Sequence, residues 1–181
     1  RRMYITGGIG SFADDEKFGP DYMLPNDGYL ETCAAVASCF FSQNLTLAHG
    51  QASTVDELER ALYNNALAGV SLAGNEYFYE NPLQCSPKRK RWTWHGCPCC
   101  PPMFLKLMGA LPGYIYATDQ ADGLYVNLFI GSTARASVRS RTASKSTASP
   151  SPSDSDSCTS AIVATRRMAS RSAVRPSSDG M

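Results

Sequence analysis

The pattern of apolar and polar residues predicts a mainly helical region that runs into β-hairpins. Between residues 29 and 47, apolar residues recur at steps of three and four, which is the spacing of one helix face, and Gly50 closes the segment. A second helix is expected over residues 54–66, because Thr54 can cap it and Glu57 can return the hydrogen bond. The residues expected on the first helix face are Cys33, Val36, Ala37, Phe40 and Phe41.

Alternating runs around Gly74-Asn75 predict a hairpin over residues 70–79. A further helix is expected over residues 103–111, opened by Pro101 or Pro102, since proline is tolerated in a first helical turn. A last hairpin is expected over residues 114–130. The glycine-, aspartate- and proline-rich segment up to residue 27 is interpreted as a long ordered loop of the kind that lines sites.

The composition changes abruptly near residue 131. Residues 1–131 contain every aromatic residue of the chain, whereas residues 132–181 contain none and are about one third serine. Arginines are scattered through this second part without helical or strand periodicity. Such a segment buries too little apolar surface to offset its ordering entropy, so a disordered tail is expected. A reading-frame shift in a gene of high G+C content would produce this kind of composition.

The formal charge of +1 gives no reason to expect a nucleic acid or a membrane surface as partner. The basic run Lys88–Arg91 is interpreted as a solvated loop rather than a phosphate site, because neither a repeat nor a stacking platform accompanies it. The sequence contains no stretch that approaches the roughly 20 apolar residues of a membrane span.

Seven cysteines, an odd number that includes the adjacent pair Cys99-Cys100, make a poor disulfide framework. A reducing compartment and thiolate or metal chemistry fit better, so a cytoplasmic location is expected. Cys39 and Cys85 are interpreted as apolar filler, and Cys158 lies in the irregular tail.

The cysteine motif Cys97-x-Cys99-Cys100 and the earlier Glu31-x-Cys33 offer several thiolates and a carboxylate from two predicted helix starts. Zinc accepts this kind of ligand set, but the paired Cys-x-x-Cys knuckles of a structural zinc site are absent from the sequence. From spacing alone, a metal site, ordinary buried cysteines and redox chemistry all stay open. The helix dipole is expected to stabilise thiolates at Cys99 and Cys100.

A series of short strings resembles the β-L-arabinofuranosidase family, glycoside hydrolase family 127, and its close relatives. The strings occur in the same order as in the family and extend from about residue 1 to residue 132. They are Met3-Tyr4-Ile5-Thr6-Gly7-Gly8-Ile9-Gly10-Ser11, Glu16-Lys17-Phe18, Leu24-Pro25-Asn26-Asp27, Tyr29-Leu30-Glu31-Thr32-Cys33-Ala34, Glu59-Arg60-Ala61-Leu62-Tyr63-Asn64, Tyr79-Glu80-Asn81-Pro82-Leu83, Cys99-Cys100-Pro101-Pro102 and Leu124-Tyr125-Val126-Asn127-Leu128-Phe129.

The resemblance implies an (α/α)6 barrel catalytic domain followed by the start of a β-sandwich. It also implies that Glu31, Cys33, Cys99 and Cys100 bind Zn²⁺, and that Cys99 is the nucleophile. The acid/base residue of the family matches Glu16, although Asp15 replaces the glycine that usually precedes it and the spacing to Glu31 is about one residue short.

These roles are those of a retaining glycosidase that releases L-arabinofuranose from β-L-arabinofuranosides. In such an enzyme Glu16 would first protonate the leaving oxygen and later activate the hydrolytic water. Zinc would keep the thiol of Cys99 deprotonated and would stabilise it again as it departs. The implied partner is a carbohydrate, and a homodimer of the parent enzyme stays open.

Three other residues are weaker candidates for this site. Glu59 and Tyr79 are possible sugar contacts, but a carboxylate beside Arg60 is more often solvated or paired, and hairpin tyrosines usually pack. His95 lies near the cysteines in sequence and could be a ligand or support one, although this is the less favoured interpretation.

The family is several hundred residues long, so the chain is expected to be a fragment. Residues 1–131 would form the C-terminal part of the barrel domain, and residues 132–181 the disordered or frame-shifted tail. The fragment alone is expected to be inactive. The alternatives are a small zinc-stabilised module without catalysis and an inactive degenerate fragment.

Overall fold

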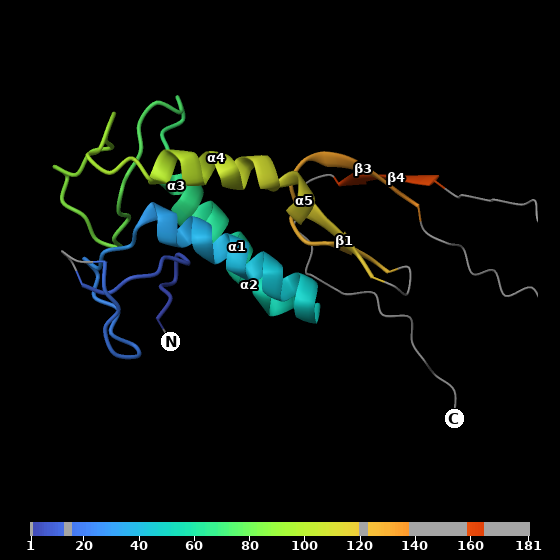
Figure 1. The fold of residues 1–181 in the computed structure, drawn as a ribbon, viewed down its shortest axis with the longest axis horizontal. Coiled ribbons are helices and arrows are strands. Elements are labelled where there is room, and N and C mark those ends of the chain that lie inside the picture. The colour runs from blue at the N-terminus through green and yellow to red at the C-terminus, as the bar shows by residue number, and fades with distance from the viewer. Residues whose placement is uncertain (1, 13–15, 120–122, 138–158, 165–181) are drawn as a thin grey trace, which may run out of the picture. The chain divides into compact units, whose positions relative to one another are not determined.

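The computed structural model describes residues 2–12, 16–119, 123–137 and 159–164. These residues form helices followed by short antiparallel strands (Figure 1). Contacts divide the chain into two compact units, Arg1–Tyr114 and Ile115–Met181. Within the described part of the chain, none of the helices combines the length and apolarity that a membrane crossing requires. The helices are α1 (Thr32–His49), α2 (Ala52–Ala61), the π-helix η1 (Leu62–Ala66), α3 (Leu67–Gly69), α4 (Cys100–Ala110) and α5 (Pro112–Ile115).

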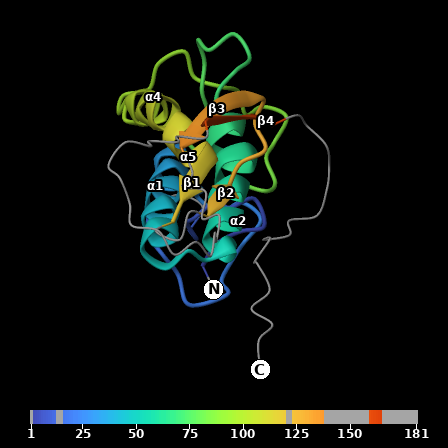
Figure 2. The same cartoon turned by 90° about the vertical axis from the view of Figure 1, so that its right-hand side faces the viewer.

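Helices α1 and α2 form an antiparallel pair that lies beside α4 in the first unit (Figures 1 and 2). Gly50 ends α1 in the left-handed conformation, with φ of 63°, and its N–H donates to the carbonyl of Thr46. Across the pair, the hydroxyls of Thr46 and Thr54 are 2.7 Å apart, and the thiol of Cys39 lies 3.7 Å from the carbonyl of Leu58. The predicted helix and its glycine stop are confirmed, although α1 begins three residues later than expected.

The apolar face expected on α1 is only partly buried. Val36 is fully buried, but Ala37 and Phe41 are exposed, Phe41 by 65%. The buried face instead carries small and polar residues, because these allow α2 to pack closely and because hydroxyls such as that of Thr46 bond to the helix backbone. The buried residues are Thr32, Ala35, Val36, Ser38, Cys39, Ser42, Gln43 and Thr46.

The second predicted helix exists, but its expected cap is wrong. The residue at the N-cap is Gln51, and Thr54 lies inside the first turn, where its hydroxyl donates to the carbonyl of Gln51 at 2.7 Å. The hydroxyl of Thr54 therefore serves the packing against Thr46 instead of opening the helix. Helix α2 then continues without a break through η1 and α3.

The glycine-rich opening string packs closely against α2 and the segment that precedes α1. At Gly7, where φ is +80°, an added Cβ would lie 2.6 Å from the Cα of Ala61. At Gly10 an added Cβ would lie 1.7 Å from the carbonyl oxygen of Tyr29. The absence of side chains at these positions lets the loop support the residues that lead into Glu31.

The segment after α3 makes a tight turn, as predicted, but only single β-bridges form. Val70 pairs with Tyr77, and Tyr77 pairs in turn with Trp92. Glu31 pairs with Glu80, and Glu80 forms an ion pair with Arg89. Arg89 of the basic run therefore has a structural partner, in agreement with the interpretation of this run as a loop.

The described residues of the second unit form two strand pairs. Strands β1 (Tyr116–Thr118) and β2 (Leu124–Val126) are antiparallel, with Ala117 opposite Tyr125, so the last predicted hairpin is confirmed in a shorter form. Strands β3 (Ser132–Ser137) and β4 (Thr159–Ala164) are also antiparallel. These twelve positions of the expected tail thus pair as a β-ladder, whose hydrogen bonds join backbone groups. The other residues of the expected tail, 138–158 and 165–181, lie outside the described residues.

Candidate metal centre

Four side chains from two distant segments meet in the first unit. Glu31 and Cys33 come from the start of α1, and Cys99 and Cys100 come from the start of α4. One ligand atom from each residue lies within 4.8 Å of all the others. Figure 1 shows the first turns of both helices at the same end of the helical layer. The structure thus brings together all four residues that the family resemblance implies as metal ligands.

The start of α1 is held in place by the strand-like segment 77–81. The backbone N–H of Thr32 donates to the carbonyl of Tyr79 at 2.8 Å, and its hydroxyl donates to the carbonyl of Phe78 at 2.7 Å. On the other side of Glu31, the N–H of Asn81 donates to the carbonyl of Leu30 at 2.8 Å. These bonds fix the backbone of Glu31 and orient the first turn of α1.

Helix α4 begins at Cys100 rather than at Met103. Cys99 is its N-cap residue, and both prolines that follow Cys100 lie in the first turn, where a missing N–H costs no hydrogen bond. The sequence therefore placed the cysteines correctly at a helix start, but put that start three residues too late.

The sulfur and oxygen atoms of the cluster are closely spaced. The Sγ atoms of Cys33 and Cys100 are 3.5 Å apart, and those of Cys99 and Cys100 are 3.9 Å apart. The Sγ of Cys99 lies 3.3 Å from Oε1 of Glu31. Cys100 is buried, while the other three residues are half-buried. A donor set of three sulfurs and one carboxylate on one small centre is suited to a divalent metal ion.

The surroundings of Cys33 and Cys99 oppose the ionisation of these two thiols. Burial raises the pKa of Cys99 to about 12. The hydrogen bond to Cys100, followed by burial, raises the pKa of Cys33 well above its usual range. The expected stabilisation of thiolates by the helix dipole stays a prediction, and the burial of Cys99 acts against it by disfavouring the charged form. A bound cation would reverse this balance, since metal binding requires the deprotonated sulfur.

The sequence of residues 1–113, which includes the whole cluster, matches the family described as β-L-arabinofuranosidase, GH127 catalytic domain. The chain belongs to this family. The predicted resemblance is thereby confirmed, and the helical first unit corresponds to part of the GH127 catalytic domain.

Three GH127 relatives illustrate the similarity. A non-reducing end β-L-arabinofuranosidase of Bifidobacterium longum subsp. longum is 40% identical over 148 residues, which are 74% of this chain and 22% of the relative. A solved GH127 β-arabinofuranosidase has a TM-score of 0.71 and 46% identity, over 76% of this chain and 22% of its own. A GH127 β-L-arabinofuranosidase from Geobacillus stearothermophilus T6 has a TM-score of 0.70 and 39% identity, over 76% of this chain and 24% of its own. The chain thus spans less than a quarter of the length of each of these GH127 proteins.

Tyr79 links the cluster of this GH127 chain to Glu16. Its ring is buried, and its Oη lies 3.4 Å from the Sγ of Cys99 and donates to Oε1 of Glu16 at 3.3 Å. Burial raises the pKa of the Tyr79 hydroxyl well above its usual value, so this group stays protonated and can act as a donor. Asp14 and Asp15, the sequence neighbours of Glu16, lie outside the described residues.

The other two candidates are not part of the metal cluster. Glu59 lies on α2 and is half-buried, and this burial raises its pKa. His95 stacks on the ring of Tyr79 with 4.3 Å between centroids, and its Nδ1 accepts a hydrogen bond from the N–H of Cys97 at 3.1 Å. His95 therefore supports the surroundings of Tyr79, and it is not among the four grouped ligands.

Tyr29 is a contributor that the sequence interpretation missed. Its ring packs edge-on against the ring of Tyr79, with 6.2 Å between centroids, and it borders the buried cluster of Tyr77, Tyr79 and Cys100. Its position two residues before Glu31, in the string Tyr29-Leu30-Glu31-Thr32-Cys33-Ala34 that carries the family resemblance, was the available signal.

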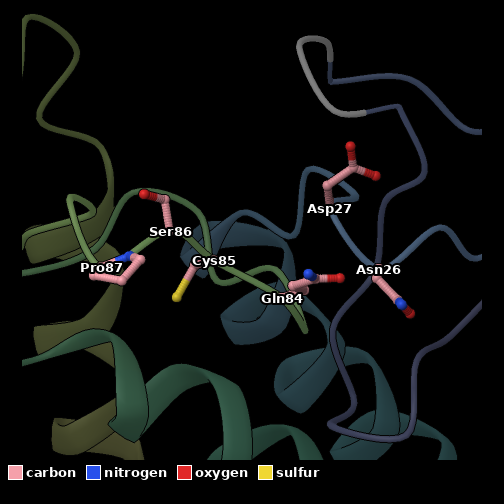
Figure 3. A pocket seen from close by; sticks show the side chains of 6 residues that line it. All are labelled: Asn26, Asp27, Gln84, Cys85, Ser86 and Pro87. Carbon is pink, nitrogen blue, oxygen red and sulfur yellow. The ribbon is translucent and has the colours of Figure 1, made fainter.

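A surface hollow lies elsewhere on the GH127 unit, between two loops (Figure 3). The hollow has a volume of about 660 Å³, and the N–H of Gln84 donates to the carbonyl of Asn26 at 2.8 Å. None of the four cluster residues lines it. Its lining residues are Asn26, Asp27, Gln84, Cys85, Ser86 and Pro87.

Proposed function

We propose that this chain is part of a retaining, zinc-dependent glycoside hydrolase that acts on β-L-arabinofuranosides with Cys99 as nucleophile. The observation that carries the proposal is the convergence of Glu31, Cys33, Cys99 and Cys100 within 4.8 Å of one another. The membership of the GH127 family and the names of the relatives support the class of reaction and the substrate.

The spacing of the donor atoms fits a tetrahedral zinc site. With Zn–S bonds of about 2.3 Å, two sulfurs of such a site lie about 3.8 Å apart, and a sulfur and a carboxylate oxygen lie about 3.5 Å apart. The corresponding separations here are 3.5 Å for Cys33 and Cys100, 3.9 Å for Cys99 and Cys100, and 3.3 Å for Cys99 and Glu31. The four residues could therefore hold the ion with little rearrangement.

Zinc bound at this site would supply a positive charge that keeps its cysteine ligands deprotonated at neutral pH. The sulfur of Cys99 would then attack the anomeric carbon while Glu16 gives its proton to the leaving oxygen. In the second step Glu16 would take a proton from water, and the water oxygen would displace the sulfur from the anomeric carbon. Two displacements on the same carbon give net retention of its configuration.

Tyr79 is placed to couple the two groups that react. Its hydroxyl contacts Oε1 of Glu16 and the Sγ of Cys99. In the proposed reaction it would hold the carboxyl of Glu16 toward the nucleophile, and it could donate to a sugar oxygen between them. Glu59 remains a proposed sugar contact, because its elevated pKa suits a partly desolvated hydroxyl-binding carboxyl group.

The proposed parent enzyme completes an (α/α)6 barrel around this unit and continues into β-sandwich domains. A reducing, cytoplasmic environment fits a centre built on three reduced cysteines. For the full-length parent enzyme, a homodimer is one of the oligomeric states that the proposal allows. The fragment alone is proposed to be inactive, since it spans 22% of its curated relative.

A zinc-stabilised module without catalysis is the second candidate. It is favoured by the position of the ligands, because one ion would tie the starts of α1 and α4 together across 66 intervening residues between Cys33 and Cys100. In this case the metal would contribute to folding, and Glu16 would have no chemical role.

Metal content and turnover, measured on the full chain, separate these functions. The enzyme proposal predicts about one zinc per chain and hydrolysis of an aryl β-L-arabinofuranoside once the missing barrel segments are supplied, with the activity lost in Cys99→Ser. Zinc binding without turnover in the completed protein would support the module. Absence of both would contradict the two proposals together.

A further inference from the structure

We propose that Cys33 and Cys100 form an oxidisable thiol pair that closes to a disulfide between α1 and α4 when no metal occupies the cluster. The two Sγ atoms are 3.5 Å apart, although the residues are 67 positions apart in the sequence. Both residues lie in the first turn of their helices, so the two side chains face each other from rigid elements.

Cys99 is a competitor of this pair within the cluster, because its sulfur lies within 4.8 Å of those of both Cys33 and Cys100. Cys99 and Cys100 have the larger Sγ separation of 3.9 Å, and a disulfide between adjacent residues forms only with strain. Cys39 is buried against the carbonyl of Leu58, on the interface of α1 with α2. A disulfide needs the two sulfurs at about 2.05 Å, so Cys33 and Cys100 must approach by about 1.5 Å, which side-chain rotation can supply.

The burial of the two residues determines which sulfur an oxidant meets first. Cys33 is half-buried, whereas Cys100 is only 1% exposed and packs in the cluster with Tyr77 and Tyr79. With hydrogen peroxide as oxidant, the sulfur of Cys33 attacks one peroxide oxygen, the O–O bond breaks and water leaves, which gives a sulfenic acid. The sulfur of Cys100 then attacks the sulfur of Cys33, the S–O bond breaks, and a second water leaves. Two thiols are thus oxidised by two electrons, and one peroxide is reduced to two waters.

The disulfide and the metal would exclude each other. Oxidation of this pair removes two of the four grouped ligands and leaves Cys99 as a free thiol beside Glu31. The disulfide would then link α1 and α4 covalently, in place of the metal ion that would otherwise bridge them. The formation of the disulfide depends only on the sulfur geometry, whereas its prevention by a metal rests on the proposed zinc function.

The test uses the full chain treated with a chelator and then with hydrogen peroxide, next to a sample loaded with zinc. After alkylation of the remaining thiols, trypsin cleavage at Lys17, Arg60, Arg91 and Lys106 separates the two cysteines into peptides 18–60 and 92–106. The expected product is these two peptides joined, with a loss of about 2 Da for the two hydrogens. Fragmentation of the joined peptides should assign the bond to Cys33 and Cys100.

Two variants make the result decisive. Cys33→Ser should abolish the joined peptides, while Cys85→Ser, which changes an exposed thiol outside the cluster, should leave their yield unchanged. The proposal would be overturned by a joined product in chelator-treated Cys33→Ser, by a bond confined to peptide 92–106, or by no joined product in the parent chain. Fragmentation that assigns the bond of Cys33 to Cys97 or Cys99 instead of Cys100 would overturn it as well. If the parent chain forms the bond equally well with and without zinc, the thiol pair stands and the zinc assignment fails.

Discussion

The hydroxyl of Tyr79 lies between two residues to which the proposed mechanism gives chemical roles. It contacts Glu16, the proposed acid/base residue, and Cys99, the proposed nucleophile, although these two residues are 83 positions apart. A tyrosine in a hairpin usually packs, and Tyr79 does pack, between Tyr29 and His95. The ring of Tyr79 thus contributes to the packing of the core, and its hydroxyl contacts the proposed catalytic residues.

Replacement of Tyr79 by phenylalanine tests this double role. The ring packing is retained in Tyr79→Phe, so zinc content should stay at the level of the parent chain. Loss of the hydroxyl should lower kcat of the completed enzyme on an aryl β-L-arabinofuranoside by about tenfold to hundredfold, because Glu16 loses its link to the nucleophile. An unchanged kcat would show that the hydroxyl has no part in the reaction, and a loss of zinc would show that it supports the metal cluster instead.

Cys39 provides a pH-dependent test at the residue scale. Burial against α2 raises its pKa from 9.0 to about 12. The fold therefore favours the neutral thiol, so the stabilisation is complete below pH 9 and is lost as the pH rises from 9 toward 12. Over that window the free energy of unfolding should fall by up to ~1.4 kcal/mol per pH unit through this group.

The measurement is urea unfolding of the parent chain and of Cys39→Ala at several pH values above 8. The variant should be less stable at neutral pH but should lose less stability per pH unit above pH 9. Parallel pH profiles for the two proteins would show that the thiol of Cys39 ionises in the folded state as easily as in the unfolded chain.

At the scale of elements, the glycine-rich loop and α2 have to fit together before Glu31 can be placed. An added Cβ at Gly7 would lie 2.6 Å from the backbone of Ala61, in a conformation with φ of +80°. Gly7→Ala should therefore lower the free energy of unfolding by about 2 to 4 kcal/mol.

Gly74 offers a matched control for this prediction. Its φ of +72° is almost the same, but an added Cβ would meet nothing within 4 Å. Gly74→Ala should cost only the strain of the left-handed conformation, about 1 kcal/mol. Both variants are measured by chemical denaturation. If the free energy of unfolding falls equally in Gly7→Ala and Gly74→Ala, the close contact of Gly7 with α2 does not contribute to stability.

The elements also show how far the sequence could predict the fold. Periodicity and turn residues indicated α1, α2 and α4, and the hairpin of β1 and β2, because each signal is local. The start of α4 was misplaced because the prolines inside its first turn were interpreted as its beginning. Only part of the expected apolar face of α1 is buried, because α2 packs against small and polar residues of α1. The packing partner of a helix cannot be identified from that helix alone.

The candidate site was predictable only in part, for similar reasons. Spacing alone left metal, core and redox interpretations open for Cys99 and Cys100, because the distance to Glu31 along the sequence says nothing about convergence in space. The resemblance to the family resolved the choice of residues. The raised pKa of Cys99 could not be predicted, since it comes mainly from burial by neighbours such as Tyr79 that belong to another segment.

At the scale of the whole molecule, the proposed site requires the starts of α1 and α4 to come together. The first unit contains both halves of the cluster, and the family match covers the same residues, 1–113. Exposed apolar side chains on the helices, such as Phe41 at 65% and Leu105 at 68%, fit a unit that packs against further helices in the proposed barrel. All four residues of the proposed metal site lie in the first unit.

The most direct test of the central claim is X-ray absorption spectroscopy at the zinc edge of the zinc-loaded full chain. Convergence of the two helix starts on one ion predicts about three sulfur neighbours at about 2.3 Å and about one oxygen neighbour at about 2.0 to 2.2 Å. The sulfur count should fall to about two in Cys100→Ser if zinc is still bound. A shell of oxygen and nitrogen alone, or the same sulfur count in the parent chain and in Cys100→Ser, would contradict a site shared by α1 and α4.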